Sequence, residues 1–239
     1  MKALNIFMTG CGLAATLLFM PACKKDLDPT IQENNNLVNT SQVQLFNAIV
    51  GSNRNYIYVD TKPLNGATIA YGSSFPANAY SFSVPSGFRA FLLKDTLVSS
   101  TQAQLSFAEN LQSQKNYTVF AYDTITTPKQ ITVETKLEIP ADTTARVRFA
   151  NFLYSTAALP AVDVFSVKRQ ANVFSGVIKT GVTNFIPYAS ALNDTLLVRW
   201  TGTTTQVIAL NGFNPTQKRS YTVVIRGGAT RAISSFANR

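Results

Sequence analysis

Residues 145–167, ARVRFANFLYSTAALPAVDVFSV, form the clearest strand–loop–strand passage in the sequence. The opening RVRF alternates polar and apolar side chains, which is the period-two pattern of a strand with one buried face. Val147 and Phe149 should therefore face a core. Arg146 and Arg148, on the opposite face, should point to water. After a loop rich in small residues, VDVF begins a second strand.

The same pattern occurs earlier in the chain, at residues 41–60. Asn47 recurs as Asn151, 104 positions later. The triplet Tyr-Thr-Val that begins at Tyr117 recurs at Tyr221, again with an offset of 104. One offset at both ends of a unit of this length predicts duplication of a whole domain and not a short solenoid repeat. Chance similarity between β-rich segments is the alternative.

RVRFAN, PAVDVF and the late YTV strand together resemble the bacterial secreted family called domain of unknown function 4397. The second half carries the Pro-Ala-Val-Asp-Val core at 160–164, and the first half matches other family motifs at 71–73 and 84–87. The first half lacks the Pro-Ala-Val-Asp core, and the second lacks the Tyr-Gly step. The resemblance covers residues 41 to 236. It implies two tandem copies of an immunoglobulin-like sandwich on the cell envelope, and it supplies no catalytic residues.

Composition also favours an all-β fold. The 239 residues are 46% hydrophobic and 14% charged, which is globular, and 16 Phe and nine Tyr favour strands. No long segment shows the 3.6-residue period of a helix. We predict two tandem immunoglobulin-like β-sandwich domains, at residues 41–139 and 144–239. Tyr117 and Tyr221 should be largely buried and bond back to the preceding corner of the chain.

Residues 1–22 are typical of a bacterial lipoprotein signal peptide. Lys2 gives a positive start, an apolar run follows, and Ala22 directly precedes Cys23. The run approaches the length of about 20 residues that spans a bilayer, so an uncleaved membrane helix is the alternative. Cleavage would leave Cys23 as the N-terminus, acylated with chains such as palmitate. Residues 23–40 would then form a polar tether.

The residue types that most catalytic and metal sites need are missing. The sequence has no histidine, which excludes Ser-His-Asp and Cys-His nucleophile systems and histidine metal ligands. Cys11 lies in the expected signal peptide and Cys23 carries the lipid, so no intrachain disulfide is possible. Asp60 and Asp163 lie in different domains and should not converge as a glycosidase pair must. We therefore expect no enzyme activity, no metal and no cofactor.

Positive charge is unevenly distributed along the chain. Residues 144–239 hold eleven Lys and Arg against two Asp, whereas residues 24–143 are nearly neutral. The excess is either an ordinary solvated surface or a contact for an anionic partner. Strand alternation, with the first and last strands side by side, predicts one exposed basic patch that binds an anionic partner. Its four members are Arg146, Arg148, Arg226 and Arg231.

The leading functional prediction is a non-enzymatic outer-membrane lipoprotein that binds or scaffolds a partner. It would contact the membrane through its lipid anchor, and an envelope protein, lipopolysaccharide or another polyanion through its basic domain. Nucleic acid is not expected. The alternative is a carbohydrate-binding accessory lipoprotein or a cryptic glycosidase. Tyr or Trp rings exposed along one groove would favour a glycan, and a basic stripe with buried aromatic rings would favour an anion. The sequence leaves open whether the protein faces the periplasm or the cell surface.

We expect the mature protein to begin at an acylated Cys23. Mass spectrometry of the N-terminal peptide from native membranes measures this directly. Cys23→Ser should leave the signal peptide uncleaved, whereas Cys11→Ser should be processed normally because that residue is removed with the signal. An intact Met1 or an unmodified Cys23 in the native protein would contradict the prediction.

Overall fold

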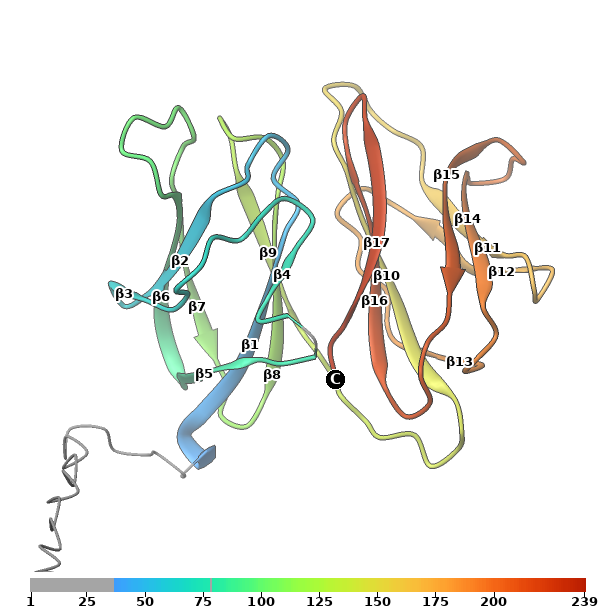
Figure 1. Ribbon diagram of the computed structural model, residues 1–239, viewed down its shortest axis with the longest axis horizontal. Helices are drawn as coiled ribbons and strands as arrows, with labels where there is room; N and C mark the ends of the chain where they lie inside the picture. The colour runs from blue at the N-terminus through green and yellow to red at the C-terminus, as the bar shows by residue number, and fades with distance from the viewer. Residues whose placement is uncertain (1–36, 78) are drawn as a thin grey trace, which may run out of the picture. The chain divides into compact units, whose positions relative to one another are not determined.

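The computed structural model describes residues 37–77 and 79–239 (Figure 1). The expected signal peptide, Cys23 and the tether as far as residue 36 lie outside the described residues. The described part is almost entirely β-structure, with one 3-10 turn, η1 (Leu37–Asn39). None of its helical segments has the length and apolar character needed to cross a membrane.

The described chain folds into two immunoglobulin-like β-sandwiches in tandem, as the sequence predicted. The first contains β1 (Thr40–Asn47), β2 (Asn55–Val59), β3 (Lys62–Pro63), β4 (Ser74–Phe75), β5 (Phe82–Pro85), β6 (Gly87–Asp95), β7 (Leu105–Leu111), β8 (Asn116–Tyr122) and β9 (Lys129–Glu134). The second contains β10 (Ala145–Leu153), β11 (Val162–Ser166), β12 (Ala171–Val177), β13 (Ile186–Tyr188), β14 (Asp194–Trp200), β15 (Gln206–Phe213), β16 (Ser220–Gly227) and β17 (Arg231–Ala237).

Each sandwich has an inner sheet, facing the other sandwich, and an outer sheet (Figure 1). The inner sheets have the strand orders β4-β1-β8-β9, with β5 also paired to β1, and β13-β10-β16-β17. The outer sheets have the orders β3-β2-β6-β7 and β12-β11-β14-β15. In the outer strand β2, side chains alternate between buried and half-buried along its length. This is the pattern of a strand with one face on the core and the other toward solvent. The two sandwiches therefore share one topology.

The first strand of each sandwich runs parallel to the penultimate strand in the same register. Val43 on β1 lies opposite Tyr117 on β8. Val147 on β10 lies opposite Tyr221 on β16. The last strand, β17, pairs with β16 and not with β10, so the expected pairing of the first and last strands is wrong.

Asn47 and Asn151 are buried and have the same role in the two sandwiches. In each, the side-chain oxygen accepts a hydrogen bond from the backbone N–H two residues later, at 3.1 Å in the first and 3.2 Å in the second. The side-chain NH₂ donates to the carbonyl of Ile69 at 3.3 Å or of Val177 at 3.0 Å. Because an unpaired buried amide is costly, this bonding explains why Asn recurs at these positions.

Tyr117 and Tyr221 form the expected corners. The backbone N–H of Gln112 donates to the Tyr117 hydroxyl at 3.0 Å. The backbone N–H of Thr216 donates to the Tyr221 hydroxyl at 3.1 Å. Both residues are partly buried and pack against the cores of their sandwiches. The ring packs against the core while the hydroxyl reaches the edge of the sandwich to meet the corner.

Each inner sheet has one face toward the core of its own sandwich and one face toward the other sandwich. The two faces between the sandwiches pack against each other and form a third hydrophobic core, in addition to the one inside each sandwich. Its buried members are Phe46, Ala48, Phe120, Ala150, Phe152 and Val224. Phe46 stacks on Phe236 with the ring centroids 5.0 Å apart. Phe120 stacks on Phe152 with the centroids 4.9 Å apart. Stacked pairs of this kind contribute about 0.5–1.5 kcal/mol each beyond the apolar area that they bury.

The two inner sheets present equivalent positions to this contact. Gln44 of β1 and Arg148 of β10, 104 positions apart, are both buried there. The Gln44 side chain donates to the carbonyl of Ala237 at 3.1 Å and accepts from the Asn238 side chain at 2.9 Å. The Arg148 guanidinium donates to Thr118 at 2.8 Å. Each sandwich thus sends one polar side chain across to the other.

A buried carboxylate, Asp194 on β14, links the outer sheet of the second sandwich to β13 of the inner sheet. Its Oδ2 accepts hydrogen bonds from the hydroxyls of Ser166 and Tyr188. Its Oδ1 accepts from the backbone N–H of Lys168 at 2.9 Å and of Thr195 at 2.7 Å. Burial alone would raise the pKa of Asp194, but these four hydrogen bonds outweigh it and lower the pKa.

Asp194→Asn should destabilise the protein at neutral pH by about 1.5–3 kcal/mol, the typical contribution of hydrogen bonds to a charged group. A lowered carboxyl pKa stabilises the fold above the unfolded-state value of 3.8, and this stabilisation is lost as pH falls through the folded-state pKa. The difference between wild type and variant should therefore shrink below about pH 4. Urea unfolding at a series of pH values measures it. Exposed Glu138, changed to Gln, is the control; a pH-independent Asp194→Asn effect would contradict the prediction.

Candidate functional site

The four arginines predicted to form one exposed patch do not form one. Arg148 and Arg226 are only 2% and 8% exposed, whereas Arg146 is partly buried and Arg231 is exposed. The strand alternation was interpreted correctly, but the face expected to meet water is covered by the first sandwich. The prediction that these four side chains share an exposed surface is therefore wrong.

Arg226 is seated in the first sandwich. Its guanidinium lies 5.6 Å from the ring centre of Phe46 and 5.1 Å from that of Tyr71, and its Nη1 donates to the Ser234 hydroxyl at 2.7 Å. Burial lowers the pKa of Arg226. A Cβ atom on Gly72 would overlap the guanidinium, so the first sandwich has a glycine where Arg226 enters. Arg226 therefore acts as a contact between the sandwiches.

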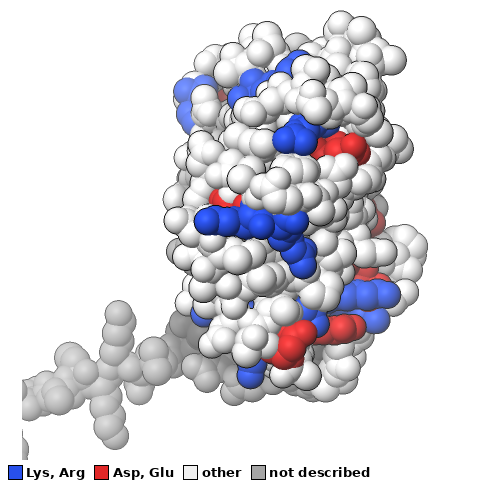
Figure 2. Space-filling view, turned by 90° about the vertical axis from the view of Figure 1, so that its right-hand side faces the viewer, with Lys and Arg blue, Asp and Glu red and all other residues white. Residues whose placement is uncertain are grey.

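Much of the positive charge of the second sandwich lies over aromatic rings. Six of its basic side chains do so: Arg148, Arg169, Lys179, Arg199, Arg226 and Arg231. Arg231 covers the ring of Trp200, the sole tryptophan, at 5.3 Å. Figure 2 shows Lys and Arg on this side of the molecule in separate groups and not as one stripe. The charge excess is thus partly structural, because a cation over an aromatic ring contributes about 0.5–2 kcal/mol.

Arg148 is a buried cation whose protein hydrogen bonds go to neutral groups. Its Nε donates to Thr222 at 2.8 Å, and its Nη2 donates to Thr118 at 2.8 Å and Thr135 at 3.2 Å. Its guanidinium also lies 4.7 Å from the ring centre of Phe185. No carboxylate of the described residues forms an ion pair with it. Burial lowers the pKa of Arg148 to about 9, so the side chain remains a cation at neutral pH.

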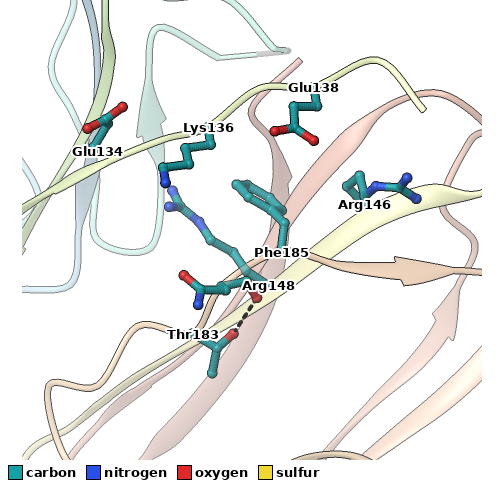
Figure 3. Close-up of a pocket in the computed structure, with 8 residues that line it drawn as sticks. Glu134, Lys136, Glu138, Arg146, Arg148, Thr183 and Phe185 are labelled. Atoms are coloured by element: carbon teal, nitrogen blue, oxygen red, sulfur yellow. Dashed lines mark hydrogen bonds between the residues drawn. The ribbon is translucent and has the colours of Figure 1, made fainter. Parts of the chain in front are cut away.

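Arg148 opens onto a cleft of about 250 Å³ between the sandwiches, which we call the inter-sandwich cleft. It is lined by Glu134, Lys136, Glu138, Arg146, Arg148, Thr183, Asn184 and Phe185. Figure 3 shows Lys136, on the segment after β9, and Arg148 pointing toward each other, with the Phe185 ring beside them. Arg146 points away from this pair. Two cations from different sandwiches therefore converge in one cleft.

The carboxylates that line the cleft do not pair with Lys136 or Arg148. Glu134 forms an ion pair with Lys115 at 3.1 Å. Arg146 lies 3.8 Å from Asp142, outside the cleft. Glu138 lines the cleft without an ion pair to a described residue. Neither carboxylate that lines the cleft therefore forms an ion pair with Lys136 or Arg148.

Sequence reasoning identified Arg146 and Arg148 but missed Lys136 and the threonines that hold the Arg148 side chain. Lys136 lies near the end of the first predicted domain, residues 41–139, and no local pattern distinguishes it from other exposed lysines. The one available signal was the offset of 104, which pairs Thr118 with Thr222 and Gln44 with Arg148. It would have shown that both inner sheets carry polar residues on the same face.

Outside the inter-sandwich cleft, Asp163 has a structural role, whereas two tyrosine rings line a second cleft. Asp163 accepts hydrogen bonds from the Gly176 N–H at 2.7 Å and the Thr201 hydroxyl at 2.9 Å, a structural role. Across the described ranges, no group of three or more His, Cys, Asp or Glu side chains could hold a metal ion. Tyr56 and Tyr58 are half-buried and line a second cleft, on the first sandwich. The structure thus contains both a converging basic pair and a groove with tyrosine rings.

Comparisons with known proteins identify a family and no function. The family model described as "Domain of unknown function (DUF4397)" matches residues 41–165, which include the first sandwich and the first two strands of the second. No curated protein sequence matches the chain.

Two solved structures are similar at low levels. One is the family 26 carbohydrate-binding module CBMbc of Eubacterium rectale Amy13K in complex with maltoheptaose, with 13% identity, a TM-score of 0.28, and coverage of 82% of this chain and 96% of that one. The other is a candidate cell adhesion protein from Bacteroides uniformis, with 12% identity, a TM-score of 0.26, and coverage of 83% and 98%. At these values the similarity carries no information about a ligand.

Gly72→Ala should lower the free energy of unfolding more than Gly176→Ala does. Both glycines have positive φ, 80° and 65°, so alanine at either costs about 1–2 kcal/mol of backbone strain. At Gly72 the new Cβ also overlaps the Arg226 guanidinium, whereas at Gly176 it meets nothing within 4 Å. We expect an additional loss of about 1–3 kcal/mol in urea unfolding, as for other overpacked contacts. Equal losses in the two variants would show that Arg226 is not seated against Gly72.

Proposed function

This chain belongs to the DUF4397 family, and because the description of that family names no function, we propose that the protein is a non-enzymatic envelope lipoprotein that binds an anionic group in the inter-sandwich cleft. The observation that carries the proposal is the convergence of Lys136 and Arg148, from different sandwiches, without an ion pair to either among the described residues. The ligand group is a phosphate or carboxylate of an envelope component such as lipopolysaccharide.

Electrostatics favours an anion at this position. Taking a cation out of water costs several kcal/mol unless an opposite charge compensates for it, and the Arg148 side chain has only hydroxyl and aromatic partners among the described residues. The Lys136 ammonium, which points toward Arg148, adds repulsion between like charges. A bound phosphate or carboxylate would relieve both costs, and it would accept charge-assisted hydrogen bonds.

The size of the cleft limits what enters it. A volume of about 250 Å³ is slightly below the range of about 300–1,000 Å³ that is usual for whole small-molecule ligands. It fits one charged group with its immediate neighbours, while the rest of the ligand remains outside. Arg146 also lines the cleft, and it would contact that remainder. The site thus suits a group presented by a larger molecule.

The remaining parts of the proposal concern origin and location. The two sandwiches arose as tandem copies of one domain; their shared strand order, the parallel pairing in the same register and the equivalent Asn and Tyr hydrogen bonds support this. An acylated Cys23 holds the protein at the outer membrane, with the polar segment of residues 24–36 between lipid and first sandwich. The ligand cleft is then within reach of envelope glycolipids and proteins.

Arg148→Met should weaken binding of lipopolysaccharide roughly ten- to a hundredfold, which corresponds to a loss of about 1.5–3 kcal/mol. The substitution should leave the fold intact, because replacing a buried ion by an apolar residue of similar size is often neutral or stabilising. The hydroxyls of Thr118 and Thr135 remain bonded to each other, at 2.7 Å. Binding is measured by calorimetry on residues 24–239 at two salt concentrations, with the melting temperature as a check on folding.

Three further variants make the test specific. Lys136→Gln should also weaken binding, and Glu138→Gln should strengthen it, because it removes repulsion from the cleft. Lys168→Gln, which removes one exposed charge from the second sandwich far from the cleft, should change affinity little. If Arg148→Met binds lipopolysaccharide as tightly as wild type, or if wild type binds neither lipopolysaccharide nor dextran sulfate, the proposal is wrong.

A further inference from the structure

The outer sheet of the first sandwich carries two tyrosines on its solvent-facing surface. Tyr56 and Tyr58 alternate along β2 with buried Asn55, Ile57 and Val59, so the pleat of the strand directs both rings away from the core. Residues two apart on a strand are about 6.6–6.8 Å apart along its axis. This sheet faces away from the second sandwich (Figure 1), so the contact between the sandwiches does not cover the rings.

The two tyrosines form the floor of a cleft of about 330 Å³, which we call the tyrosine cleft. Its walls include Lys94 on β6 and the loop between β6 and β7, where Leu97 and Val98 are exposed. The Lys94 ammonium lies 4.9 Å from the ring centre of Tyr58.

Internal hydrogen bonds fix the loop that forms the wall. Asp95 accepts from the Leu97 N–H at 2.9 Å and from the Ser100 hydroxyl at 2.8 Å. The Ser100 hydroxyl in turn accepts from the Gln102 N–H at 3.1 Å. The Gln102 side chain donates to Asn55 at the start of β2. These hydrogen bonds link the loop to β2 and so fix this wall of the cleft.

We propose that the tyrosine cleft binds a neutral carbohydrate chain. The apolar faces of pyranose rings pack on aromatic side chains, and their hydroxyls need donors and acceptors in the same plane. The tyrosine hydroxyls, the Lys94 ammonium and the carboxamide of Gln104 supply these groups at the cleft. The Gln104 side chain is exposed and makes no hydrogen bond to another described residue, so it is available to a ligand.

Charge distinguishes this site from the inter-sandwich cleft. The lining includes one cation, Lys94, and one carboxylate, Asp95, which forms an ion pair with Arg54 at 3.4 Å. A site with both signs and no unpaired buried cation has no preference for a polyanion. The two proposals are independent, since Arg148→Met should not affect the tyrosine cleft and tyrosine variants should not affect anion binding.

Affinity gel electrophoresis of residues 24–239 tests the proposal. Native gels would contain soluble starch, xylan, galactomannan or mixed-linkage β-glucan as neutral probes, with a gel lacking polysaccharide as reference. We expect at least one probe to retard the wild-type chain. Tyr58→Ala and Tyr56→Ala should each weaken that retardation about tenfold or more, as for central aromatic contacts in other interfaces.

The controls separate loss of a ligand contact from loss of fold. Tyr80→Ala removes a tyrosine that is 69% exposed outside the cleft, and it should leave retardation unchanged. Tyr58→Phe should retain most of the affinity because the ring remains, and Gln104→Ala should weaken it without touching the core. Absence of retardation by every probe, or equal effects of Tyr58→Ala and Tyr80→Ala, would overturn the proposal.

Discussion

The packing of one inner sheet against the other is the contact on which the rest of the structure depends. This contact covers the faces of β1 and β10 that point away from their own sandwich cores. Both strands are therefore buried on both sides for most of their length. Fully burying one Phe side chain contributes about 1.5–3 kcal/mol, and Phe46, Phe120 and Phe152 are all buried there. The two sandwiches therefore share a core and form one compact unit of the described chain.

That contact also determines where part of the positive charge of the second sandwich lies. Two arginines expected at the surface, Arg148 and Arg226, are buried in it, where hydroxyl groups and aromatic rings replace water. Arg suits such a position better than Lys, because its planar guanidinium stacks on rings and forms several hydrogen bonds at once. Where the contact opens, Arg148 and Lys136 face space that a ligand could fill.

The division into inner and outer sheets separates the two candidate sites. The inner sheets pack against each other, and the inter-sandwich cleft beside this contact carries positive charge. The outer sheet of the first sandwich is free of this contact and has tyrosine rings on its open face. Two sandwiches can thus be held together through one sheet of each, which leaves the other sheet free for ligands.

The sequence alone determined the all-β class, the two sandwiches and the equivalence of Asn47 with Asn151 and of Tyr117 with Tyr221, because period-two alternation and local hydrogen bonds act over a few residues. It also excluded histidine-based chemistry. Only the tertiary structure decided that the polar face of β10 is buried, since alternation identifies two faces of a strand but not what covers the second. The same limit hid the approach of Lys136 to Arg148 and the cleft over Tyr56 and Tyr58, because both depend on segments that are brought together by packing and not by sequence proximity.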